Sequence, residues 1–321
     1  MIRWALLVAL ALGALPAAAA DGGDGLAWLQ RVASAARTVN YVGTFVYQHG
    51  NRVESSRIIH LVDETGEHEK LETLDGPPRE IIRHNDEIYC YFPEAKRLRI
   101  EKGLPRKTFP ALLPDQLSAL AENYHVRLGG RERIAGYECQ VILLEPKDGL
   151  RYGHKLWADA GSGLLIKAIM FDDKGRVVEQ FAFTQVEIGR PIDRALLQPK
   201  YEARALVQQE NVMTDGQGAA KPSGWVIRDP PPGFKKVLEA RRMLGAKPRP
   251  VTHIMLSDGL VAVSVFVEAV EPNPPAIHRL SNQGAINVVS RVVNNHLITV
   301  VGEAPAVTVM KIANSIAHQD Q

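Results

Sequence analysis

The chain has 321 residues, of which 45% are hydrophobic, 23% charged and 6% aromatic. At about 150 residues per domain, this length predicts two domains with cores of their own. The composition excludes disordered, collagen-like and disulfide-stapled miniprotein classes. Lys and Arg (38) exceed Asp and Glu (36) by two, so the overall charge gives no reason to expect a nucleic-acid partner.

The N-terminus has the pattern of a secretory signal peptide. Arg3 precedes an apolar run over residues 4–15, and a proline and four alanines follow, ending at Ala20. The run is too short to cross about 30 Å of hydrocarbon as a helix. We therefore expect residues 1–20 to be removed on export. Asp21 follows the cleavage site and no cysteine lies near it, so we expect no acyl anchor.

Residues 25–37 repeat apolar side chains at a helical period, after which the pattern changes to short β-rich segments separated by turns. Tight turns and few intervening helices favour an antiparallel meander over β-α-β alternation. The expected strands are 41–49, 56–62, 80–84, 87–92, 97–101, 125–134, 137–145, 151–159, 164–172 and 177–188.

One insertion, residues 107–123, carries a stripe of leucines and predicts a helix. Such a helix could plug or cover the concave face of a curved sheet. A helix packed on an ordinary core is the alternative.

Between residues 201 and 222 the patterning lapses, which predicts a linker. The predicted fold class is α+β, with a large antiparallel domain over 21–200 and a smaller α+β domain over 223–321. The smaller domain is expected to contain strands at 252–258, 260–270, 286–293 and 296–303 and a terminal helix over 305–317.

Two cysteines, Cys90 and Cys139, lie in exported sequence, where disulfides persist. Each shares a strand face with apolar neighbours, so both are expected to point into a core. Two alternatives stay open: a disulfide, or two small buried apolar side chains.

No catalytic, cofactor or metal site is predicted. The sequence contains no phosphate-binding loop, no GxSxG elbow and no HExxH motif. None of the ten histidines is spaced as a clean ligand pair, which indicates scattered structural or surface positions.

Aromatic side chains at alternate positions of the first and last expected strands of the large domain share a strand face. A sheet that curls without closing must fill its inner side with a helix, a second layer or a ligand. An acyl chain buried there would gain about 0.8 kcal/mol per methylene. The candidate ligand-binding residues are Tyr41, Phe45, Tyr47, Phe109, Leu112, Leu113, Leu117, Phe181 and Phe183.

Two basic runs, residues 96–107 and 235–249, each carry six Lys or Arg against one Glu. Either run could meet phosphates or an acidic peptide, and a solvated surface is the alternative. In and just before the second run we select as candidate partner-binding residues Trp225, Phe234, Lys235, Lys236, Arg241 and Arg242.

Several blocks then resemble one known family, the RseB/MucB periplasmic regulators of the envelope-stress sigma factor. They are the strand YVGTFVY (41–47), the stretches 127–159 and 162–188, and the blocks HIMLSDGLVAVSVFVEAVE (253–271) and TVVGEAPAVTVMKIANSI (299–316). The resemblance covers nearly all of the mature chain, and these blocks are structural signatures without catalytic residues.

The resemblance implies a non-enzymatic periplasmic protein without a cofactor. Its larger domain would be similar to the lipoprotein carriers LolA and LolB, an unclosed β-barrel with helices over its mouth. The smaller domain would bind the periplasmic part of a membrane-spanning anti-sigma factor and shield it from regulated proteolysis.

Lipid, lipopolysaccharide or mislocalised lipoprotein would release that partner, and contact with the membrane would be only through the partner. A lipid or lipoprotein carrier of the LolA/LolB type is the alternative function, and an envelope hydrolase is a third. Homo-oligomerisation is left open.

Overall fold

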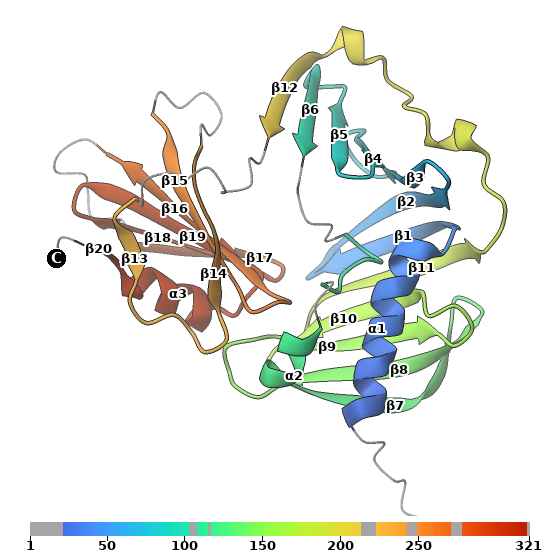
Figure 1. The fold of residues 1–321 in the computed structure, drawn as a ribbon, viewed down its shortest axis with the longest axis horizontal. Coiled ribbons are helices and arrows are strands. Elements are labelled where there is room, and N and C mark those ends of the chain that lie inside the picture. Colours follow the sequence, from blue (N-terminus) through green and yellow to red (C-terminus); the bar gives the residue numbers. More distant parts are fainter. Residues whose placement is uncertain are drawn as a thin grey trace, which may run out of the picture.

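The computed structural model describes residues 22–102, 108–114, 117–212, 223–242, 249–270 and 278–319. The expected signal peptide, residues 1–20, lies outside these ranges. The described chain forms a larger unit on a twelve-stranded sheet and a smaller unit on a six-stranded sheet, with a two-stranded sheet in the smaller unit (Figure 1).

The large sheet has the strand order β12-β6-β5-β4-β3-β2-β1-β11-β10-β9-β8-β7. Neighbours run antiparallel, except that β12 lies parallel to β6. The end strands β12 and β7 do not pair with each other in the described part of the chain, so the expected unclosed sheet is confirmed. Its first eleven strands are β1 (Tyr41–His49), β2 (Arg52–Asp63), β3 (Gly66–Thr73), β4 (Glu80–His84), β5 (Glu87–Phe92), β6 (Arg97–Lys102), β7 (Tyr124–Ile134), β8 (Tyr137–Pro146), β9 (Gly153–Asp159), β10 (Leu165–Phe171) and β11 (Val177–Ile188).

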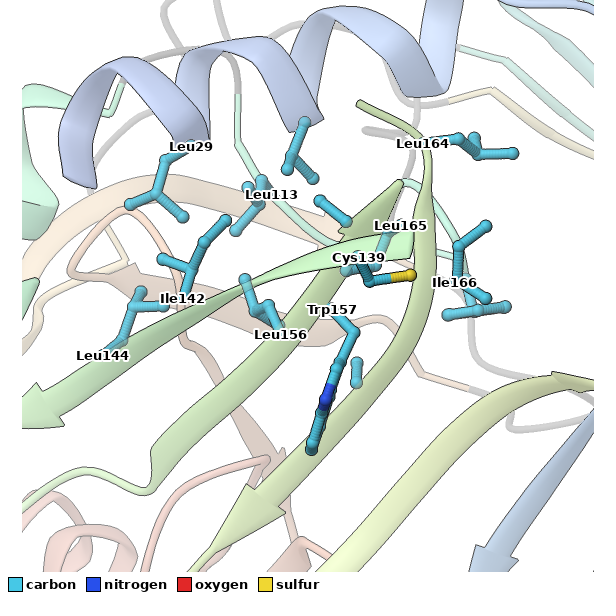
Figure 2. Packing of buried hydrophobic residues seen from close by; sticks show 14 of the residues in the cluster. Leu29, Leu113, Cys139, Ile142, Leu144, Leu156, Trp157, Leu164, Leu165 and Ile166 are labelled. Atoms are coloured by element: carbon cyan, nitrogen blue, oxygen red, sulfur yellow. The ribbon is translucent and has the colours of Figure 1, made fainter. Parts of the chain in front are cut away.

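Helix α1 (Gly22–Thr38) crosses one face of this sheet and contacts β7, β8 and β10 (Figure 1). Its apolar stripe is buried at Leu29 and Val32, which are three residues apart and therefore on one helix face. Ile142 and Leu156 belong to the same core cluster (Figure 2). The helix thus covers the half of the sheet formed by the later strands.

The inserted segment differs from expectation. In place of one helix over 107–123, residues 108–114 include a bridge between Thr108 and Ala111, and helix α2 covers only Ser118–Asn123. The two prolines in this stretch lack amide donors and drive the residues before them out of the helical region. Most of the leucine stripe therefore lies outside regular helix.

The expected linker, residues 201–222, is wrong in part because it contains a strand. Two short 3₁₀ turns (Arg194–Leu197 and Ala203–Ala205) lead to β12 (Val207–Val212), which pairs with β6. Residues 213–222 lie outside the described ranges. The β12 sequence, VQQENV, lacks the apolar alternation that predicts a strand, whereas its backbone pairs with that of β6.

The smaller unit has the strand order β14-β15-β16-β19-β18-β17, all antiparallel. Its core includes Val263, Val265 and Val300 from the sheet and Ile312 from helix α3 (Ala306–Ser315). The four expected strands and the helix are present, and four short or polar strands, β13, β14, β17 and β20, were missed. The strands are β13 (Trp225–Ile227), β14 (Lys235–Arg242), β15 (Val251–Ser257), β16 (Ala262–Ala269), β17 (His278–Gln283), β18 (Ile286–Val293), β19 (His296–Gly302) and β20 (Ile316–His318).

Both cysteines are free and buried, so the alternative of two small apolar side chains is the one found. Cys90 lies on β5 and Cys139 on β8, strands that are not neighbours in the sheet. Cys139 packs among apolar side chains of the main core (Figure 2).

Candidate functional site

An apolar pocket of about 240 Å³ lies in the larger unit. It is bounded by strands from both halves of the sheet, by the 108–113 segment, and by three residues of the smaller unit. Leu71, Leu144, Leu156 and Ala168 contribute much of its aliphatic wall. An engineered apolar cavity of about 150 Å³ suffices to hold benzene, so this pocket has room for a longer hydrocarbon.

Six of the nine candidate ligand-binding residues line this pocket, and three do not. Tyr41 is fully buried and stacks on His60, with ring centroids 4.9 Å apart. Leu117 and Phe183 are also buried in the surrounding core. Strand parity predicted the correct face but not how far the pocket extends along it. The six lining residues are Phe45, Tyr47, Phe109, Leu112, Leu113 and Phe181.

Stacked aromatic rings form one wall of the pocket. Phe181 stacks on Phe109 at 5.5 Å and on Tyr47 at 4.6 Å between ring centroids. Phe45 lies 5.1 Å from Phe109 in a tilted arrangement. The rings come from β1, β11 and the 108–113 segment, so the irregular segment is held against the sheet by aromatic contacts.

A small polar set accompanies this apolar wall. The Tyr47 hydroxyl donates a 2.9 Å hydrogen bond to Glu179 Oε2. Burial, and then the carboxylates of Glu179, Glu303 and Glu54, raise the pKa of Tyr47, so the phenol stays protonated at neutral pH. Arg79 also lines the pocket. The arrangement suits an apolar chain with one polar end.

The smaller unit closes part of this pocket, which the sequence did not indicate. Leu260, Val261 and Glu303 line it, and Leu260 also belongs to the main apolar cluster of the larger unit. Leu260 and Val261 lie in the turn between β15 and β16, and Glu303 follows β19. The site is therefore shared between the two units.

Arg151, in the turn between β8 and β9, ties the units together. Its side chain is fully buried, and its Nε donates a 2.5 Å hydrogen bond to the equally buried Asp258 of the smaller unit. It also pairs with Asp148, donates to the carbonyl of Pro232 and lies over the Phe234 ring at 5.1 Å. These groups offset the cost of burying the charge.

Two further hydrogen bonds join the units near this ion pair. The Thr308 hydroxyl donates to the carbonyl of Leu150 at 2.6 Å, and Asn287 donates to the Tyr152 hydroxyl at 3.1 Å. The β8–β9 turn is thus bonded to both α3 and β18.

The candidate partner-binding residues divide by burial. Trp225 and Phe234 are buried in the core of the smaller unit, so their selection as surface contacts is corrected. Lys235, Lys236 and Arg241 are exposed on β14, an end strand of the six-stranded sheet, and Arg242 ends that strand. The sequence predicts these two aromatic side chains as contacts to a partner because they lie in or near a basic segment. In the structure they pack in the core and anchor the segment that leads into β14.

Among the described residues, no cluster of three or more His, Cys, Asp or Glu side chains could hold a metal ion. None of the helices in the described ranges combines the length and hydropathy needed to cross a membrane.

The fold is therefore that of a two-domain β-rich protein. Its open sheet bears an apolar pocket, and the docked smaller sheet domain shares that pocket. Family models match both parts: the MucB/RseB N-terminal domain over residues 24–201 and the MucB/RseB C-terminal domain over residues 219–317. The chain belongs to the MucB/RseB family, which confirms the resemblance seen in the sequence.

Relatives match over nearly the whole chain. The sigma factor AlgU regulatory protein MucB of Pseudomonas aeruginosa is 33% identical over 318 residues, covering 97% of this chain and 96% of that protein. The sigma-E factor regulatory protein RseB of Salmonella typhimurium is 30% identical, covering 97% and 95%. In the solved MucA/MucB complex of P. aeruginosa, the matching chain has a TM-score of 0.75 at 29% identity, covering 92% of this chain and 99% of that one.

Proposed function

We propose that this protein is a periplasmic negative regulator of an envelope-stress sigma factor. It would bind the periplasmic domain of a membrane-spanning anti-sigma factor and shield that domain from regulated proteolysis. The observation that carries the proposal is the end-to-end similarity to MucB, together with the match to MucB in its complex with MucA(peri) at a TM-score of 0.74. Residues 1–20 would direct the chain to the periplasm and then be removed.

The smaller domain, residues 223–321, would supply the partner surface. Strand β14 pairs with β15 on one side and carries the exposed Lys235, Lys236 and Arg241. An edge strand of this kind can accept an extended peptide as an added strand, and its cations favour an acidic one. Because exposed charges act through a screened field, this contribution should weaken as salt rises.

The pocket in the larger domain, residues 21–200, would receive one acyl chain of a lipid, a lipopolysaccharide or a lipoprotein. Each methylene buried there stabilises the complex by about 0.8 kcal/mol. To release the partner, the acyl ligand must bind the partner-free protein more tightly than the partner-bound protein. The ratio of these two affinities equals the factor by which the ligand weakens partner binding. A tenfold weakening corresponds to about 1.4 kcal/mol of coupling.

A simple lipid carrier is a weaker proposal. A carrier needs the pocket but not a second sheet domain that is fixed to the pocket by a buried ion pair. We likewise propose no catalytic role: Tyr47 and Glu179 at the pocket are hydrogen-bonded to each other, and the family models that match the chain are those of the MucB/RseB domains.

The test is a titration of a purified anti-sigma ectodomain against the mature protein. We expect saturable binding, and we expect a Lys235→Glu/Lys236→Glu/Arg241→Glu variant to bind at least about tenfold more weakly with a flatter salt dependence. Arg131→Glu/Arg133→Glu, on an exposed part of β7, is the matched control. Equal affinities for the β14 variant and wild type would reject the β14 surface, and an absence of binding would reject the function.

A further inference from the structure

The turn between β15 and β16, residues 257–261, is built to hold one leucine against the larger domain. Asp258 Oδ1 accepts hydrogen bonds from the backbone N–H groups of Leu260 (3.0 Å) and Val261 (2.8 Å). The Asp258 N–H in turn donates to the Val261 carbonyl at 3.2 Å. One carboxylate oxygen therefore fixes the shape of the turn.

The other oxygen of the same carboxylate faces the larger domain. Asp258 Oδ2 accepts from Arg151 Nε at 2.5 Å, and neither side chain is exposed. A Cβ added at Gly259 would lie 3.3 Å from the Ala119 Cβ, so the turn also rests on helix α2. Asp258 thereby couples the conformation of the 257–261 turn to its attachment.

This attachment holds the Leu260 side chain in the larger domain. Only 7% of its surface is exposed, and it belongs to the apolar cluster of the larger domain rather than to that of its own domain. It also lines the pocket. The pocket beside it is partly open: scaled from a cavity of about 150 Å³ that holds six-carbon benzene, its volume of about 240 Å³ holds roughly ten carbon atoms.

We propose that Leu260 is a displaceable plug: a chain of up to about ten carbons fits beside it, whereas a longer acyl chain replaces it and lifts the 257–261 turn from the larger domain. The ligand site is then also the docking site of the smaller domain, and chain length sets whether the domains stay joined. This inference rests on the acyl-binding part of the proposed function.

Hydrogen exchange of the mature protein tests the plug, with octanoate and tetradecanoate as probes below their micellar concentrations. The Leu260 and Val261 amides are bonded to Asp258, so they report directly on the turn. We expect saturating tetradecanoate to speed exchange in a peptide covering 257–261 by at least tenfold, and octanoate to leave it unchanged or slower. The core strand β19 of the smaller domain is the internal control.

A Leu260→Ala variant gives the second readout. It should bind tetradecanoate about tenfold more tightly, because the ligand no longer expels a buried leucine, while octanoate affinity stays the same. Leu280→Ala is the matched control, since Leu280 is 48% exposed on β17 of the same domain.

Slower exchange of the 257–261 turn with tetradecanoate, or weaker tetradecanoate binding by Leu260→Ala, would overturn the plug while leaving acyl binding intact. If neither fatty acid binds wild type or variant, the plug and the acyl part of the proposed function both fail. Neither experiment involves the anti-sigma partner. The partner-binding part of the proposed function is therefore tested independently, by the ectodomain titration.

Discussion

Replacing Arg151 by Met tests how strongly the two domains are joined. The guanidinium contacts two carboxylates, one backbone carbonyl and the Phe234 ring, and its side chain is fully buried. The substitution leaves Asp258 buried without a cation, a change that costs about 3–5 kcal/mol in comparable buried pairs. Most of this loss should fall on the contact between the domains, because Asp258 and the Pro232 carbonyl both belong to the smaller one.

Urea unfolding followed by tryptophan fluorescence and by circular dichroism measures the effect. Trp225 is the sole tryptophan of residues 223–321, whereas Trp28 and Trp157 report on the larger domain. We expect Arg151→Met to separate the two transitions. Arg127→Met is the control, because Arg127 pairs with Glu145 on an exposed surface and should cost at most about 1 kcal/mol. If Arg151→Met loses no more stability than the control, the buried ion pair does not hold the domains together.

Three further predictions concern the larger domain. Hydrogen bonds from two lysines outweigh burial and lower the pKa of Glu72, so wild-type stability should fall as pH drops below about 4.3. Lys70→Met should lower the free energy of unfolding by about 3–5 kcal/mol at pH 7, because it leaves buried carboxylates without their lysine. The variant should regain stability toward pH 5, since protonation of a carboxylate removes a buried charge. A variant that loses stability between pH 7 and pH 5 in urea titrations would contradict this. Burial raises the pKa of Cys139 to about 11, and both cysteines are free and buried. Ellman's reagent should therefore detect two thiols only after the protein is unfolded. A melting temperature that dithiothreitol lowers would disprove free cysteines. Ala168→Phe should fill the pocket and weaken fatty-acid binding at least about tenfold, whereas Val177→Phe, at an exposed position, should not; unchanged binding to the filled pocket would place the ligand elsewhere.

The strands that sequence patterning predicted best are those with clear apolar content. Strand β11 matches its expected range because aromatic and β-branched residues continue through it. Strand β3 was missed because its sequence, GEHEKLET, reads as a polar turn. In the fold Lys70 is only 2% exposed and pairs with Glu72 at 3.0 Å and Glu80 at 3.1 Å, so charged residues form a buried face through mutual pairing.

The sequence predicted some of the pocket residues on the larger domain's strands but none of those that the smaller domain contributes. Alternation along β1 and β11 indicates which side chains share a face, and three of the residues it selected, Phe45, Tyr47 and Phe181, line the pocket. It contains no information about residues brought from a separate domain. Leu260 and Arg151 are far apart in sequence, and their roles follow from the docking of two domains, which periodicity does not encode.

We propose that this protein binds an anti-sigma ectodomain and releases it when an acyl chain enters the pocket. The most direct measurement is a calorimetric titration of that ectodomain into the mature protein, without and with saturating tetradecanoate. We expect saturable binding that weakens at least about tenfold with the fatty acid present, equivalent to about 1.4 kcal/mol of coupling. Binding of equal strength in both titrations, or none in either, would contradict it.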